Sequence, residues 1–199
     1  MMRIGLTGNI GSGKTTVSRL FAMHGVPLYY ADERAKHFLN TPDTLMKIRE
    51  AFGDACIDGE GKPDRKKIAE LVFGDADKLE ILNNIIHPQV RQDFLDWTAG
   101  QLHHPYVIME AAILFESGQY KSFHKVIIVT APETLRIERV CSRDAVHPED
   151  VKKRMQHQMK EDAKVPLADF VITNNGQELL IPQVEAVHKQ ILALCKQGK

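Results

Sequence analysis

The residues with the clearest chemical signature form a glycine-rich run at positions 8–15 (GNIGSGKT), which fits the pattern G-x-x-x-x-G-K-[ST] throughout. Glycines let a backbone wrap closely around a phosphate, and the amides of the loop and of a following helix then point at the anion. Lys14 is expected to reach the β- and γ-phosphates of a nucleoside triphosphate, and the Thr15 hydroxyl to ligate Mg²⁺. An apolar run at 3–7 precedes the motif and a helix-forming run at 16–23 follows it, as its chemistry requires.

Two acidic residues at or just after the ends of apolar runs could take part in the same chemistry. Glu110 ends the run 106–110. An acid there orients magnesium through water in proteins with such a loop, and the alternative is a chance acid at a strand end. Asp32 comes just after the run 26–30, so we expect it at the carboxyl edge of the sheet, where ligands bind. It could accept the proton of an attacking hydroxyl as a general base, or it could be the N-cap of a helix.

A strongly charged stretch at 132–165 contains four arginines. Arg136, Arg139 and Arg143 recur at i, i+3 and i+7, which is one face of a helix, and Arg154 follows on the next predicted helix. Guanidinium groups closing over a γ-phosphate would neutralise the charge that spreads during transfer and would exclude water. We therefore predict a lid at 132–165 in which Arg139 and Arg143 are catalytic. The alternative is a solvated basic face balanced by nearby acids.

Five short runs rich in Val, Ile, Leu or Tyr are typical of parallel strands buried on both faces. Their alternation with helical patterns predicts one α/β domain over 1–199, a three-layer sandwich of a five-stranded parallel sheet with helices on both faces. The expected strands lie at 3–7, 26–30, 106–110, 125–130 and 169–173.

The segment 33–104 is far longer than a crossover between strands requires, and its apolar positions recur at helical spacing. We predict it to be a helical insertion that binds the acceptor of the reaction. Helices are expected at 42–52, 64–73 and 75–86 in this insertion, at 132–142 and from Pro148 onward in the lid, and at 184–194 near the end of the chain.

Bulk composition argues against several classes of protein. Lys+Arg and Asp+Glu are equal at 26 each, so a broad electrostatic attraction to nucleic acid or to an anionic membrane is not expected. The three cysteines are widely spaced and odd in number, which indicates reduced thiols in a cytoplasmic protein. No apolar run approaches the ~20 residues needed to cross a bilayer, and the first residues do not resemble a signal peptide. The sequence specifies no oligomeric state.

The choice among phosphate chemistries follows from motifs beyond the loop. A switch GTPase should carry Asn-Lys-x-Asp, which does not occur, and the D-x-x-G match at 58–61 falls in a polar turn of the insertion. Large ATPase motors need more chain and further sensor elements. A small kinase therefore remains, with a donor loop, an acceptor pocket and an arginine lid.

Several segments, taken in order along nearly the whole chain, resemble the dephospho-coenzyme A kinase family. They are GLTGNIGSGKTT, YYADERAK, GKPDRKKIAELVF, LNNIIHPQV, EAAILFESG, RVCSRD and ADFVITNNG. The resemblance implies ATP-dependent transfer of a phosphoryl group to the ribose 3′-hydroxyl of 3′-dephospho-coenzyme A, the last step of coenzyme A synthesis. The alternatives are another small-molecule kinase, acting on a nucleoside or nucleotide, and a non-catalytic nucleotide-binding regulator.

The resemblance also implies roles for matching positions. Asp32 would be the base, and Arg65, His87 and Phe115 would lie on the acceptor side, although His87 could be an ordinary structural histidine and Phe115 could belong to the core. The family usually has Asp at Glu110 and Pro at Ala112, and the Glu110 side chain keeps the charge but is one methylene longer. The positions that would contact ATP are Gly11, Ser12, Gly13, Lys14, Thr15 and Thr16, with Asn174 and Asn175 near the adenine.

Overall fold

The computed structural model describes residues 1–72 and 74–197, and a five-stranded parallel sheet lies at its centre. The strand order is β2-β3-β1-β4-β5, and β1 pairs with β3 on one side and β4 on the other. All five predicted strands are confirmed, with ends that shift by at most two residues. They are β1 (Met2–Thr7), β2 (Leu28–Tyr30), β3 (Tyr106–Glu110), β4 (Lys125–Thr130) and β5 (Phe170–Thr173).

The chain divides into two compact units. The first consists of Met1–Tyr30 with Gln101–Lys199 and contains the sheet, and the second is Ala31–Gly100. The second unit begins and ends within a few residues of the predicted insertion at 33–104. That it binds the acceptor stays a prediction.

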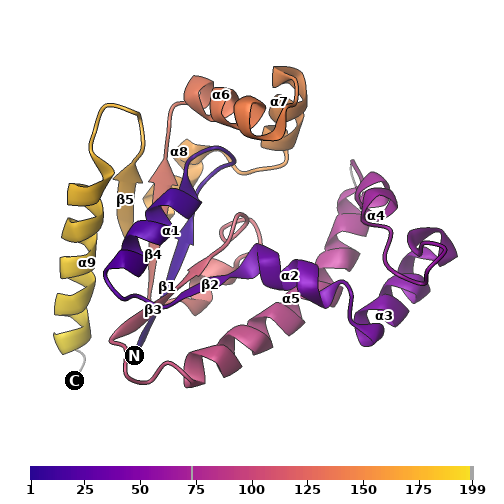
Figure 1. The fold of residues 1–199 in the computed structure, drawn as a ribbon, viewed down its shortest axis with the longest axis horizontal. Helices are drawn as coiled ribbons and strands as arrows, with labels where there is room; N and C mark the ends of the chain where they lie inside the picture. The colour runs from indigo at the N-terminus through magenta and orange to yellow at the C-terminus, as the bar shows by residue number, and fades with distance from the viewer. Residues whose placement is uncertain (73, 198–199) are drawn as a thin grey trace. The chain divides into compact units, whose positions relative to one another are not determined.

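In the first unit, α1 (Lys14–Met23) and α9 (Leu180–Gln197) pack on one face of the sheet (Figure 1). Their buried side chains join the strand residues Ile4, Leu6 and Ile127 in one apolar core. The opposite face of β1 is covered by the segment after β3, because a Cβ at Gly5 would meet Leu114 at 2.5 Å and Phe123 at 3.4 Å. The core therefore holds β1, and with it the start of the glycine-rich loop, from both sides.

Three further helices follow β4 in the first unit. Pro148 occupies the first turn of its helix as predicted, since its ring suits a position whose N–H would have no partner in the helix. The predicted helix at 132–142 begins one residue later and continues two residues further. The helices are α6 (Glu133–Asp144), α7 (Pro148–Gln156) and the short α8 (Glu161–Lys164).

The second unit has its own small core, in which Ile48, Cys56 and Ile68 are buried. The prediction that its last helix ends at Ile86 was wrong, because the helix continues through Pro88 to Ala99. Buried Ile86, Val90 and Phe94 recur at helical spacing and offset the hydrogen bond that the proline removes. The predicted end of another helix at Phe73 lies outside the described residues. The helices are α2 (Ala31–Phe38), α3 (Pro42–Phe52), α4 (Arg65–Val72) and α5 (Ala76–Ala99).

Candidate active site

The glycine-rich loop connects β1 to α1, and its geometry depends on the absence of two side chains. Gly11 and Gly13 have φ angles of 78° and 93°, which side-chain-bearing residues rarely adopt. A Cβ at Gly11 would lie 2.4 Å from the carbonyl oxygen of Arg136, and one at Gly13 would lie 2.2 Å from Nδ2 of Asn174. The loop is therefore packed closely against α6 and against the residue that follows β5.

The N-terminus of α1 is suited to an anion. Its N-cap residue, Gly13, provides no side-chain hydrogen bond, and the first turn of the helix contains no acidic residue. The first amides of a helix have no partner within it, and the helix dipole favours negative charge at this end. The hydroxyl oxygen of Ser12 is also buried without a hydrogen-bond partner among the described residues. These groups fit a bound phosphate.

Thr15 and Glu110 lie together, as a magnesium site in such a loop requires. The Thr15 hydroxyl donates to Oε1 of Glu110 at 3.3 Å, and the Ser18 hydroxyl donates to Oε2 at 3.1 Å. Hydroxyl and carboxylate oxygens are ligands or water-holding groups that suit Mg²⁺. The longer Glu110 side chain thus reaches Thr15 and Ser18, and its role toward magnesium stays a prediction. Ser18 was missed in the sequence, although it lies one helical turn after Thr15 on the same face of α1.

Arg139 contacts the glycine-rich loop directly. Its guanidinium donates to the carbonyl of Gly11 at 3.4 Å, and to the carbonyl and side-chain oxygens of Asn174 at 3.2 and 3.1 Å. Asn174 in turn donates from Nδ2 to the carbonyl of Ser12 at 2.8 Å. In the structure the side chains of Arg139 and Asn174 therefore stabilise the loop by hydrogen bonds to its carbonyl groups. Lys14 donates to the carbonyl of Gly8 at 3.0 Å.

The other arginines of the lid region differ in their surroundings. Arg136 is buried, donates from Nε to the carbonyl of Ala131 at 3.0 Å, and has no hydrogen-bond partner for Nη1 among the described residues. Arg143 is largely exposed and forms a two-bond contact with Asp144, which holds the pKa of that carboxyl below its ordinary value. Arg154 contacts the same carboxylate at 3.1 Å, so Asp144 joins α6 to α7.

Two further predicted residues make contacts that shape the protein itself. Asn175 accepts from the amides of Gln177 and Glu178 through Oδ1 and so orders the turn after β5. Phe115 is buried, with its ring 5.2 Å from that of Tyr120, which agrees with the alternative that it belongs to the core. Their roles toward adenine and acceptor stay predictions.

The second unit contains Asp32, Arg65 and His87. Asp32 is the second residue of α2 and lies in its first turn, so it is not the N-cap residue. His87 lies on α5, where burial lowers the pKa of its imidazole and the carboxylate of Asp32 partly offsets that effect. Arg65, the first residue of α4, donates to the carbonyl of Lys36 at 3.2 Å. The two side chains Asp32 and His87 are therefore electrostatic neighbours.

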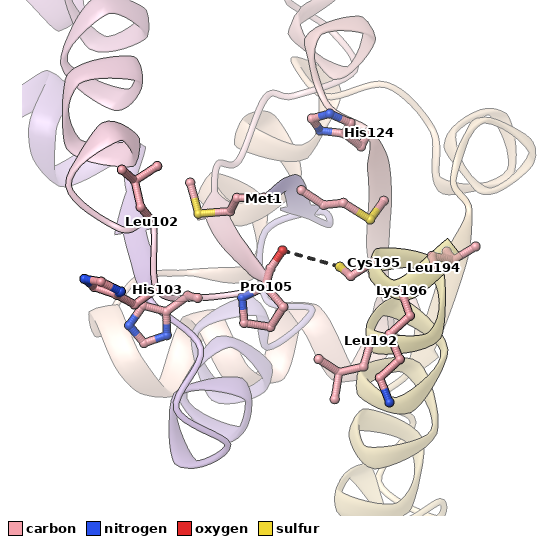
Figure 2. Close-up of a pocket in the computed structure, with 11 residues that line it drawn as sticks. Met1, Leu102, His103, Pro105, His124, Leu192, Leu194, Cys195 and Lys196 are labelled. Atoms are coloured by element: carbon pink, nitrogen blue, oxygen red, sulfur yellow. Dashed lines mark hydrogen bonds between the residues drawn. The ribbon is translucent and has the colours of Figure 1, made fainter. Parts of the chain in front are cut away.

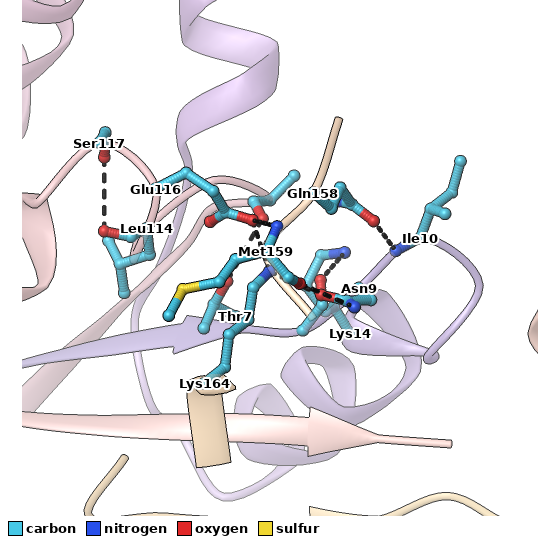
Figure 3. A network of polar contacts seen from close by, with 12 residues as sticks. Thr7, Asn9, Ile10, Lys14, Leu114, Glu116, Ser117, Gln158, Met159 and Lys164 are labelled. Atoms are coloured by element: carbon cyan, nitrogen blue, oxygen red, sulfur yellow. Dashed lines mark hydrogen bonds and ion pairs between the residues drawn. The ribbon is translucent and has the colours of Figure 1, made fainter. Parts of the chain in front are cut away.

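A buried polar network extends from the glycine-rich loop and was not predicted from the sequence (Figure 3). It joins Asn9, Glu116 and Lys164, of which Lys164 is fully buried. Lys164 belongs to a run with three other charged residues, a composition typical of a solvated surface, so no local signal identifies its burial.

The structure also contains a pocket of about 680 Å³ that is not part of this site (Figure 2). Its lining includes Met2 at the start of β1, Pro105 before β3, His124 before β4 and Cys195 of α9. These are the amino ends of the strands, whereas the glycine-rich loop follows the carboxyl end of β1. The Cys195 thiol donates to the carbonyl of Pro105 at 3.4 Å.

None of the helices in the described parts of the chain combines the length and the apolar character that spanning a membrane would require.

Comparison with known proteins gives consistent matches over almost the whole chain. The model of a family described as dephospho-CoA kinase matches residues 2–179. A dephospho-CoA kinase of Aquifex aeolicus is 37% identical over 193 residues, covering 96% of this chain and 98% of the relative. A solved Thermus thermophilus structure has a TM-score of 0.82 at 34% identity, covering 96% of each chain. A dephospho-CoA kinase from Campylobacter jejuni has a TM-score of 0.67 at 27% identity, covering 99% and 98%. The predicted three-layer α/β fold is confirmed.

Proposed function

The chain belongs to the dephospho-CoA kinase family, and from this premise we propose that it transfers the γ-phosphoryl group of ATP to the ribose 3′-hydroxyl of 3′-dephospho-CoA. The products are coenzyme A and ADP. The observation that supports the donor half of this reaction most directly is the contact of Thr15 with Glu110 beside an uncapped helix N-terminus.

The donor side uses the glycine-rich loop and α1. The loop amides and the start of α1 hold the phosphates of ATP, and Lys14 neutralises charge on the β- and γ-phosphates. Thr15 and Glu110 would hold Mg²⁺, which would supply further neutralisation of charge on the transferred group when bound. Arg139 holds the glycine-rich loop in its conformation, and Arg143 contacts the γ-phosphate when the lid closes.

The acceptor side uses the second unit. Asp32 orients the 3′-hydroxyl and accepts its proton, which a carboxylate can do only in its ionised form. His87 is neutral at pH 7, since burial lowers the pKa of its imidazole, and it can hydrogen-bond the acceptor without adding charge. Arg65 is a further acceptor-side residue of the second unit, and Phe115 of the first unit stays a predicted acceptor contact. The protein acts in the cytoplasm and binds neither nucleic acid nor membrane.

A coupled assay of ADP release tests this proposal. Purified protein is given MgATP with dephospho-CoA, with nucleosides, with nucleoside monophosphates, or with no acceptor. The proposed function predicts ADP release when dephospho-CoA is the acceptor and none with the other acceptors or without an acceptor. Turnover with the nucleosides or monophosphates alone would identify another small-molecule kinase, and ATP binding without any turnover would identify a regulator.

A further inference from the structure

Lys164, at the end of α8, connects three segments that are far apart in the sequence (Figure 3). Its side chain is 0% exposed, and its ammonium lies 2.6 Å from Oδ1 of Asn9 and 2.6 Å from Oε1 of Glu116. An ammonium buried without such partners would be strongly unfavourable. Burial of Lys164 therefore requires that Asn9 of the glycine-rich loop and Glu116 of the segment after β3 stay beside it.

The same network fixes the backbone that follows α7. The amide of Met159 donates to Oε1 of Glu116 at 3.1 Å, and Nδ2 of Asn9 donates to the carbonyl of Met159 at 3.3 Å. The amide of Ile10 donates to Oε1 of Gln158 at 2.8 Å. Two consecutive residues of the glycine-rich loop are thus held by two consecutive residues from the end of the lid region.

The network around Lys164 restrains the segment of the loop in which glycines allow the most backbone freedom. Gly8, Gly11 and Gly13 give the loop backbone many accessible conformations, and only some of them direct its amides at a phosphate. Asn9 is buried and both ends of its side-chain amide have partners in the network, so it holds the loop in one conformation before ATP arrives. Ordering a binding loop in advance lowers the entropic cost of binding.

We propose that Lys164 is a positioning residue for the glycine-rich loop, which it holds in the ATP-binding conformation through Asn9 and Glu116. It touches no phosphate itself. This inference deepens the proposed function and rests on it only for the identity of ATP as donor. Loss of Lys164 weakens ATP binding while it leaves the binding of dephospho-CoA largely unchanged.

The test measures nucleotide affinity apart from catalysis. A fluorescent, non-hydrolysable ATP analogue is titrated with magnesium into the parent, into Lys164→Met and into the control Lys152→Met, an exposed lysine paired with Glu149. We expect Lys164→Met to bind the analogue about tenfold more weakly, with the KM for dephospho-CoA within about threefold of the parent, and Lys152→Met to match the parent. Equal affinity in Lys164→Met and the parent would overturn the proposal.

A double variant separates positioning from the cost of an unpaired charge. In Lys164→Met the Glu116 carboxylate, whose side chain is only 19% exposed, loses its cationic partner, and the protein is destabilised for that reason alone. Lys164→Met/Glu116→Gln removes the charge and keeps an oxygen that can accept from Met159. We expect it to regain thermal stability but not ATP affinity.

Recovery of both stability and affinity in the double variant would assign Lys164 a purely structural role, as would failure of both variants to fold, and either result would overturn the proposal. If Lys164→Met alone does not fold, the double variant is judged by the same affinity criterion. Because the titration contains no acceptor, a parent that binds ATP but does not phosphorylate dephospho-CoA would contradict the proposed function and not this inference.

Discussion

At the scale of single residues, the site brings together an acid from the end of a strand and two hydroxyl groups from α1. The Glu110 carboxylate reaches both Thr15 and Ser18 from the end of β3. The sequence predicted the place of this acid at the end of a strand, and its role toward magnesium stays a prediction. It did not predict Ser18, because a serine on a helix becomes significant only when a strand far away in the sequence places a carboxylate beside it.

A pair of substitutions at Glu110 tests its role. Glu110→Gln keeps two groups that can hydrogen-bond Thr15 and Ser18 but removes the charge, so kcat should fall by about 10- to 100-fold with a higher requirement for Mg²⁺. Glu110→Asp keeps the charge and should retain activity within about tenfold of the parent. Steady-state rates over a magnesium titration make the measurement. Similar activity in Glu110→Gln and the parent would exclude a role in magnesium binding.

Asp32 is the proposed base for the acceptor hydroxyl. Asp32→Asn is nearly isosteric and cannot accept the proton of the 3′-hydroxyl, so transfer should fall by about 100-fold or more while ATP affinity stays close to that of the parent. Glu33→Gln, its neighbour in the first turn of α2, is the matched control and should leave the rate unchanged. Full activity in Asp32→Asn would remove Asp32 as the base.

At the scale of elements, the contact between the glycine-rich loop and α6 can be isolated with two glycines of similar backbone conformation. Gly11 and Gly25 have φ angles of 78° and 75°, but an added Cβ meets Arg136 at 2.4 Å in the first case and nothing within 4 Å in the second. Gly25→Ala should cost about 1 kcal/mol of unfolding free energy from backbone strain alone. Gly11→Ala should cost more and also weaken ATP binding by about tenfold or more.

Urea unfolding and nucleotide titration of both variants make the comparison. Equal losses of stability, with ATP affinity preserved in Gly11→Ala, would show that the close approach of α6 to the loop is unimportant.

The packing of α9 on the sheet includes a group that responds to pH. The hydroxyl of Tyr106 in β3 lies 2.6 Å from Nδ1 of His188 in α9, and the ring of His188 stacks on that of His24 at 4.8 Å. Burial lowers the pKa of His188, and His24 and Lys189 lower it further. The folded state therefore favours the neutral form of His188. The stability that neutral His188 contributes is present above its ordinary pKa of 6.5 and is lost as pH falls through its lowered pKa in the folded protein.

We expect the unfolding free energy of the parent to fall between about pH 8 and pH 5, and the fall to be smaller in His188→Gln, whose amide oxygen can still accept from Tyr106. Urea titrations at several pH values measure both slopes. Parallel slopes would contradict a contribution from His188.

The elements also show what could be predicted from the sequence and what could not. The strands were predicted because each is a short apolar run covered on both faces, a pattern that local composition carries. The length of α5 was not predicted, because a proline such as Pro88 usually interrupts a helix. The packing of Val90 and Phe94 in the fold keeps the helix going beyond it. The burial of Lys164 was not predicted either, because its partners Asn9 and Glu116 come from segments that are distant in the sequence.

At the scale of the whole molecule, the residues predicted to hold the donor and those predicted to hold the acceptor fall largely in two different compact units. The first contains the sheet, the glycine-rich loop, Glu110 and the lid region, and the second contains Asp32, Arg65 and His87. We propose that ATP and Mg²⁺ bind to the first unit, and that Asp32, Arg65 and His87 of the second unit bind dephospho-CoA. The proposed reaction is therefore a transfer between two substrates, not hydrolysis of ATP or binding alone.

Phosphorus NMR of the reaction mixture tests that claim most directly, since it identifies both the donor fragment and the position of the new phosphate. With MgATP and dephospho-CoA, we expect ADP and a phosphomonoester on the ribose 3′-oxygen to appear in equal amounts, with no free phosphate. Formation of ADP and inorganic phosphate without a new phosphomonoester, or a phosphate at another position, would contradict it.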